Sequence, residues 1–125
     1  MQEYSLKIEK LRRMGILVGY IDKKLLYCPI YDKKYPKECK EIMQDILNRK
    51  DEYIPILEQM SYERVKNYKG VLVDILGDKE SMQLNATFFC KLLKPKYGEI
   101  FTLDKNNIDE VAKDLAIALY TKGEF

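Results

Sequence analysis

Apolar and polar side chains alternate from residue 82 to residue 92, and this pattern restricts the fold more than any other feature of the sequence. Successive side chains of a strand point to opposite faces of a sheet, so the alternation predicts a long strand with one buried face. Its apolar residues are Met82, Leu84, Ala86, Phe88, Cys90 and Leu92. The runs GVLVDILG (70–77) and EIFTLD (99–104) also predict strands. Because polar turns separate them, the three segments predict a three-stranded antiparallel meander.

A second β segment is predicted near the start of the sequence. The runs ILVGYI (16–21) and LLYCPI (25–30) flank a short polar turn, which is typical of a β-hairpin. Proline cannot donate a hydrogen bond to a ladder, so Pro29 predicts an edge strand or the end of a strand. Residues 3–13 fit both an alternation and a helical spacing, but their many helix formers favour a helix that Gly15 ends.

The middle of the sequence predicts a helical hairpin over residues 36–68. Apolar residues behind Pro36 recur with the spacing of one helix face, which predicts an amphipathic helix ending near Lys50. These apolar residues are Cys39, Ile42, Met43, Ile46 and Leu47. Asp51 can cap the second helix of the pair, and Pro55 is tolerated early in it.

A last helix is predicted behind Asn107, which has the spacing of a capping box with Glu110. Gly123 lies where this helix would stop. The apolar stripe of the helix is Ile108, Val111, Ala112, Leu115 and Leu119. All these elements together predict a single α+β domain over residues 1–125. In it, the hairpin and the meander join into one antiparallel sheet, and the helical hairpin and the C-terminal helix pack on that sheet.

The composition argues against several kinds of site. Because the 125 residues include no histidine, neither a cysteine nor a serine can belong to a histidine-activated nucleophile pair. Cys28, Cys39 and Cys90 form no CxxC motif, so a zinc-ribbon site is not expected and the cysteines are interpreted as small core residues. We therefore expect no metal, no cofactor and no catalytic residue.

The charge and the hydropathy pattern predict where the protein acts. A net charge of +2 is low for a protein that binds duplex nucleic acid, because phosphate neutralisation supplies most of such affinity. No segment approaches the roughly 20 apolar residues of a membrane span. Residues 1–13 are too charged for a secretory signal. These observations favour a cytoplasmic protein without a membrane partner.

The stretch YCPIYDKKYPKECK (27–40) is the strongest candidate binding site. Single-stranded nucleic acid is held by aromatic rings that stack on bases and by cations that follow the phosphates. The candidate binding residues are Tyr27, Tyr31, Lys33, Lys34, Tyr35 and Lys37, and Lys23 and Lys24 at the hairpin turn could extend them. The alternative interpretation is a solvated basic loop that leads into a helix.

A magnesium-dependent nuclease is a further alternative. Asp74 would lie on a strand and Lys91 on the next one. Asp78 and Glu80 would lie in the turn between them, where two-metal chemistry needs carboxylates to converge. Restriction-type nucleases place an acid two residues before the lysine, but Phe89 stands there in this sequence. The nuclease pattern is therefore incomplete.

An interaction protein fits the sequence better than an enzyme does. Ten tyrosines stand against four phenylalanines, and tyrosine suits interfaces because it buries a large ring while its hydroxyl stays hydrated. A binder needs only a stable scaffold and an exposed anchor cluster, whereas an enzyme needs convergent polar groups. We therefore expect a non-catalytic regulatory, inhibitory or accessory subunit that docks on a macromolecular partner, above all a protein. Single-stranded nucleic-acid binding is the alternative, and self-association is compatible with either.

Overall fold

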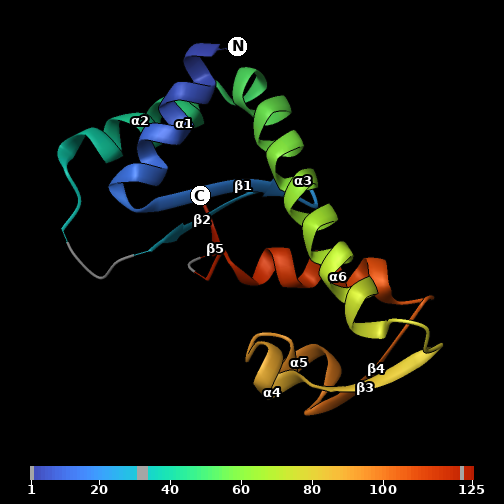
Figure 1. The fold of residues 1–125 in the computed structure, drawn as a ribbon. Coiled ribbons are helices and arrows are strands. Elements are labelled where there is room, and N and C mark those ends of the chain that lie inside the picture. The colour runs from blue at the N-terminus through green and yellow to red at the C-terminus, as the bar shows by residue number, and fades with distance from the viewer. Residues whose placement is uncertain (1, 31–33, 122) are drawn as a thin grey trace. The chain divides into compact units, whose positions relative to one another are not determined.

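The computed structural model describes residues 2–30, 34–121 and 123–125, and the chain forms two compact units (Figure 1). Unit 1 comprises Met1–Tyr62 together with Tyr120–Phe125, and unit 2 comprises Glu63–Leu119. Since compact units can be parts of one domain, the single domain over residues 1–125 stays a prediction.

Unit 1 begins with helix α1 (Gln2–Met14), which confirms the helical interpretation of residues 3–13. Gly15 follows with a φ of 100°, a conformation that ends a helix readily only at glycine. Strands β1 (Ile16–Ile21) and β2 (Lys24–Pro29) then form the predicted antiparallel hairpin. The third strand of the sheet, β5 (Gly123–Glu124), pairs with β2, so β2 is central and ends at Pro29.

Two helices follow in unit 1, as the sequence predicts, but the second extends beyond residue 68 and its part from Glu63 onward belongs to unit 2. Helix α2 (Lys37–Asn48) starts directly after Pro36, and helix α3 (Lys50–Leu76) follows it after one residue. The core of the unit combines one face of α1, the inner face of the hairpin and the facing sides of α2 and α3. Its buried residues are Ile8, Leu11, Ile16, Val18, Cys39, Ile42, Ile46, Tyr53 and Leu57.

Residues 70–77, for which the sequence predicts a strand, are helical up to Leu76 instead. The reason is the spacing of apolar residues over the whole segment, which follows one helix face through Leu72 and Leu76, both buried in the core of unit 2. Val71 and Val73, which make the run look like a strand, are left exposed. Packing thus overrides the local β propensity of this segment. The helix ends at Leu76, and Gly77, which follows it, has a φ of 54°.

The long strand predicted over residues 82–92 is also wrong. Strand β3 (Ser81–Asn85) stops where the side chain of Asn85 caps the one-turn helix α4 (Ala86–Phe89). Asn85 Oδ1 accepts hydrogen bonds from the backbone N–H groups of Thr87 (2.9 Å) and Phe88 (3.3 Å). A second one-turn helix, α5 (Lys94–Tyr97), replaces the predicted turn and ends at Gly98 with a φ of 83°.

Only two of the three predicted meander strands therefore exist. Strand β4 (Ile100–Asp104) is confirmed and pairs with β3 in antiparallel register, from Ser81 opposite Asp104 to Asn85 opposite Ile100. This two-stranded sheet is separate from the three-stranded sheet of unit 1. The prediction that hairpin and meander join into one sheet is wrong.

Helix α6 (Ile108–Ala118) closes unit 2 and buries Ile108, Val111, Ala112 and Leu115 of the predicted stripe. It ends before Leu119 and before Gly123, where the sequence predicts its end. The predicted capping box is wrong, because the Asn107 side chain turns back to strand β4. It accepts from the backbone N–H of Asp104 (2.9 Å) and donates to the carbonyl of Thr102 (2.7 Å). Most of the core lies between α3, α6 and the β3–β4 sheet. The buried core residues are Leu72, Leu76, Leu84, Ala86, Leu93, Phe101, Leu103, Ile108, Val111, Ala112 and Leu115.

Each unit combines helices with a small antiparallel sheet, so the predicted α+β class is confirmed. Within residues 2–30, 34–121 and 123–125, no helix combines the length and the apolar character that crossing a bilayer requires.

Candidate functional site

The predicted basic and aromatic site is only partly visible in the structure. Tyr31 and Lys33 lie outside the described residues. Lys34 and Lys37 are exposed. Tyr27 and Tyr35, by contrast, are half-buried and pack against the core of unit 1.

Both of these tyrosines make contacts within unit 1. The Tyr27 ring lies 5.2 Å from the Phe125 ring between centroids, and the Tyr35 hydroxyl donates to the Gly15 carbonyl at 3.3 Å. A ring held in this way offers less of its face to a nucleic-acid base. Nucleic-acid binding by this stretch therefore stays a prediction, and no contact described here favours it.

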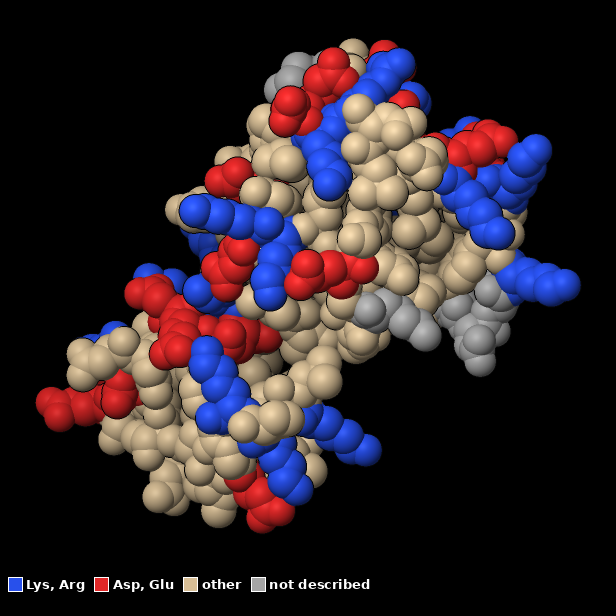
Figure 2. All heavy atoms as spheres, turned by 180° about the vertical axis from the view of Figure 1, so that it is seen from behind, with Lys and Arg blue, Asp and Glu red and all other residues tan. Residues whose placement is uncertain are grey.

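The surface charges are mixed on the face drawn in Figure 2. There, lysine and arginine side chains lie next to aspartate and glutamate side chains. Ion pairs among the described residues include Lys69 with Asp109 at 2.8 Å and Lys94 with Glu99 at 3.0 Å. Binding to a phosphate backbone depends on uncompensated positive charge, and this face does not concentrate it.

The predicted nuclease constellation does not form. Asp74 lies on helix α3 rather than on a strand, because residues 70–76 are helical. Among the residues that the structure describes, no three aspartate, glutamate or cysteine side chains are grouped so that they could hold a metal ion.

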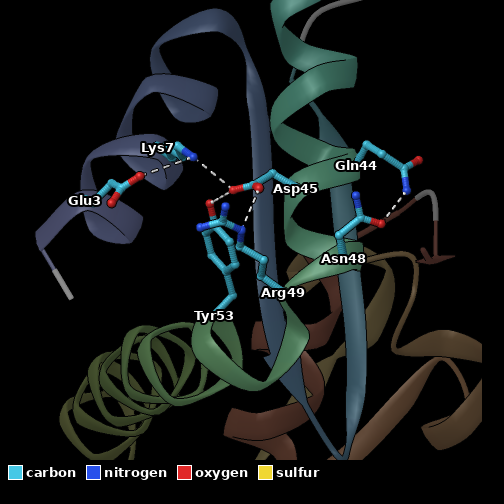
Figure 3. Close-up of polar contacts among 7 residues, drawn as sticks. All are labelled: Glu3, Lys7, Gln44, Asp45, Asn48, Arg49 and Tyr53. Carbon is cyan, nitrogen blue, oxygen red and sulfur yellow. Dashed lines mark hydrogen bonds and ion pairs between the residues drawn. The ribbon is translucent and has the colours of Figure 1, made fainter.

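A polar cluster of unit 1 centres on Asp45 of α2 (Figure 3). Asp45 Oδ2 accepts from Lys7 Nζ of α1 at 3.0 Å and from the Tyr53 hydroxyl of α3 at 2.6 Å. Arg49 Nε lies 3.3 Å from the other carboxylate oxygen. These bonds, that of Tyr53 above all, hold the pKa of Asp45 below its usual value. Because Lys7 reaches Asp45 from α1 and Tyr53 reaches it from α3, the cluster connects three helices of unit 1.

A similar cluster fixes the short helix α5 in unit 2. Lys96 Nζ lies 2.8 Å from a Glu110 oxygen and 3.0 Å from an Asp114 oxygen, and both acids belong to α6. The hydrogen bonds to Glu110 and Asp114 raise the pKa of Lys96. The Tyr97 hydroxyl also donates to Asp114. A helix of one turn has little stability of its own, so these contacts determine where it sits.

Three large apolar side chains are exposed around helix α4. Phe88 is 90% exposed, Ile100 is 62% exposed and Leu92 is 51% exposed. Ile100 pairs with Asn85 directly before α4, and Leu92 lies in the turn that follows α4. We call these three residues the α4 surface.

Contacts within unit 2 hold helix α4 in place. Ala86 is fully buried, and its N–H donates to the Glu99 carbonyl at 2.7 Å. Phe89 packs against the core of unit 2, so the neighbouring Phe88 ring is directed away from it. Together with the Asn85 cap, these contacts fix α4 in a position that holds Phe88 in solvent.

An apolar pocket of about 270 Å³ opens beside α4 within unit 2. Two of its residues, Phe89 and Cys90, come from α4 and its C-cap, and the others come from α3 and the end of α6. The lining residues are Tyr68, Val71, Phe89, Cys90, Leu115, Ala118 and Leu119. A pocket of this size and character can receive an apolar side chain from another molecule.

Sequence reasoning missed the α4 surface because the alternation placed Phe88 on a buried strand face. One signal could have revealed it, since Asn85 followed by Ala86 is typical of a helix start. No protein-family model, curated protein or solved structure matches this chain. Its function must therefore be inferred from the geometry of its surfaces.

Proposed function

We propose that this chain is a non-catalytic interaction protein that docks on a protein partner through the α4 surface. It would act as a regulatory, inhibitory or accessory subunit. The observation that carries the proposal is the 90% exposure of Phe88 on a helix that its own contacts hold in place.

An exposed phenylalanine is costly unless a partner covers it. Full burial of such a side chain is favourable by about 1.5–3 kcal/mol relative to exposure. Single exposed apolar residues are common, but a contiguous exposed apolar patch is typical of an interface, and Phe88, Leu92 and Ile100 would form such a patch around α4. Aromatic residues near the centre of an interface often supply most of the binding energy.

The α4 surface and the neighbouring pocket together define what the partner must offer. It needs a recess for the Phe88 ring and an apolar side chain that enters the pocket beside Phe89. Helix α4 would need little further ordering on binding, because the contacts of Asn85 and Ala86 already fix it. Such preorganisation improves affinity without adding contacts.

A cytoplasmic location is part of the proposal. Cys28, Cys39 and Cys90 are all free thiols, which suits a reducing compartment. Self-association would be one form of the same activity, with a second copy as the partner.

The proposal is tested with one variant and a matched control. Phe88→Ser removes the central ring, whereas Leu6→Ser removes an apolar side chain that is 63% exposed on α1 of unit 1. Tagged wild-type protein is used to recover partners from the cells that produce it. Each recovered protein is then purified and titrated by calorimetry against the wild type and both variants.

We expect Phe88→Ser to lose at least tenfold in affinity, which corresponds to about 1.4 kcal/mol of binding free energy. The affinity of Leu6→Ser should be unchanged. Hydrogen exchange of residues 86–92 should also slow in the complex. Equal binding by wild type and Phe88→Ser would place the interface elsewhere, and chemical turnover of the partner would contradict a non-catalytic role.

A further inference from the structure

A second cavity, of about 290 Å³, lies entirely within unit 1 and does not involve the α4 surface. It is bounded by the end of the β1–β2 hairpin, the start of α3 and the β5 segment with the residue that follows it. Its lining residues are Tyr20, Lys23, Lys24, Leu25, Lys50, Ile54, Glu124 and Phe125.

The charge of this cavity is unbalanced. Lys24 Nζ lies 3.3 Å from Glu124 Oε1, so these two lining charges compensate each other. Lys23 and Lys50 also line the cavity, and neither forms an ion pair with any residue that the structure describes. Among the residues that the structure describes, these two lining lysines therefore have no ion-pair partner.

The two lysines are presented by well-fixed elements. Lys23 lies in the two-residue turn of the hairpin, where Asp22 and Lys23 have φ values of 55° and 64°. The flanking pair Ile21–Lys24 closes the ladder directly beside this turn. Lys50 is the first residue of α3, and Ile54 lies one turn further on the same helix face.

Four residues that line the cavity are aromatic or aliphatic. Tyr20, Leu25, Ile54 and Phe125 are all half-buried there. Phe125 is anchored because its N–H donates to the Leu25 carbonyl at 3.1 Å and its ring packs on Tyr27. The cavity is thus lined by ammonium groups as well as by rings and aliphatic groups.

We propose that this cavity binds a small aromatic phosphate monoester. The phosphate lies between the ammonium groups of Lys23 and Lys50, and the ring packs against Tyr20, Ile54 and Phe125. A phosphate monoester carries about 1.5 to 2 negative charges at neutral pH, which matches the two uncompensated lysines. The volume is at the small end of ligand pockets, so it accommodates one ring rather than a larger molecule.

The test uses phenyl phosphate as the probe and the 125-residue chain labelled with nitrogen-15. Amide shifts are followed during titration with phenyl phosphate, and separately with inorganic phosphate and with benzyl alcohol. We expect shifts concentrated at residues 20–25, 50–54 and 124–125, with phenyl phosphate binding at least tenfold more tightly than either fragment. Higher salt should weaken the binding.

Two variants distinguish binding in this cavity from nonspecific attraction of the phosphate to a positively charged surface. The double substitution Lys23→Gln with Lys50→Gln should weaken phenyl phosphate binding at least tenfold, whereas Lys105→Gln, an exposed lysine of unit 2, should leave it unchanged. The amide spectrum of each variant shows that it is folded. Shifts spread over both units, unchanged affinity in the double variant, or equal binding of benzyl alcohol would overturn the proposal. Since Phe88 takes no part, the result is independent of the proposed docking function.

Discussion

Gly19 of strand β1 faces Tyr120 so closely that a methyl group on its Cα would lie 2.2 Å from the Tyr120 hydroxyl oxygen. The same methyl group would lie 3.0 Å from the hydroxyl oxygen of Ser61. Tyr120 is only 5% exposed and Ser61 only 2%. Because both neighbours are buried, neither can move aside easily, and glycine is required here for space rather than for its backbone conformation.

Gly19→Ala is therefore expected to destabilise the protein by about 1–3 kcal/mol, the usual range for overpacking a filled core. Urea unfolding followed by circular dichroism measures the change. Gly70→Ala is the matched control, because nothing lies within 4 Å of the added carbon. Since Gly70 is inside helix α3, that control should be neutral or more stable by about 0.5–1 kcal/mol. Equal stability of Gly19→Ala and the wild type would contradict the close packing.

Asp45→Asn should reduce the free energy of unfolding by about 1 kcal/mol at neutral pH, because the charged acceptor between Lys7 and Tyr53 is lost. The loss is no larger because the Asp45 side chain is partly exposed and solvent screens its charge. The pKa of Asp45 is lowered from 3.8 by folding, so its contribution is complete above that value. The contribution is lost as the pH falls through the lower, folded-state pKa. Urea unfolding from pH 7 down to the acid range should show wild type and variant converging.

Glu3→Gln serves as the control for this series, since the Glu3 carboxylate is 67% exposed and lies 3.6 Å from Lys7. Its effect should be close to zero at every pH. A constant difference between wild type and Asp45→Asn down to acid pH would show that packing, not charge, explains the loss.

Tyr97→Phe should loosen helix α5 without unfolding unit 2. The substitution removes the hydroxyl that donates to Asp114 and keeps the ring, which packs 5.1 Å from the Phe101 ring. Hydrogen exchange measured by mass spectrometry should become several-fold faster at residues 94–98 and stay unchanged in α6. Tyr62→Phe is the control, because the Tyr62 side chain is 61% exposed. If both variants exchange like the wild type, the contact with Asp114 does not position α5.

The docking proposal also predicts a negative result with nucleic acid. Labelled single-stranded DNA and RNA should show no micromolar binding at moderate salt, and Lys34→Glu should change nothing in fluorescence anisotropy. Steeply salt-dependent binding that disappears in Tyr31→Ala would support the nucleic-acid alternative instead.

Helix α2 and the β1–β2 hairpin could be predicted from the sequence because their signals are local. Cys39, Ile42 and Ile46 recur on one helix face, and all three are buried. The hairpin has its polar turn between two β-prone runs, and its register follows from that turn. In such segments the period of the apolar residues and the turn chemistry agree, so packing only confirms the local preference.

The segment 70–92 could not be predicted in the same way, because local preference and packing disagree there. Val71 and Val73 favour a strand, yet Leu72 and Leu76 are buried on one face of a helix. Further on, a single side-chain cap at Asn85 ends the strand although the alternation continues to Leu92. Which of two competing patterns is realised depends on the core that each would build.

The candidate sites were still harder to predict than the fold. The six residues proposed from the sequence lie within the single stretch 27–37, whereas the α4 surface is made by residues from a helix, a turn and a strand. Lys7 and Asp45 are 38 positions apart, and their contact exists only once α1 and α2 are packed. Sequence spacing contains no signal for contacts of this kind.

The division of the chain also imposes an order on folding during synthesis. Unit 2 is one continuous segment, Glu63–Leu119, whereas unit 1 needs Tyr120–Phe125, which leave the ribosome after all of unit 2. Until these last residues emerge, the space beside Gly19 is unfilled and strand β2 lacks its β5 neighbour. The residues of unit 1 that precede Glu63 are therefore made before unit 2 but completed only after it, and any pause or truncation before Tyr120 leaves unit 1 incomplete.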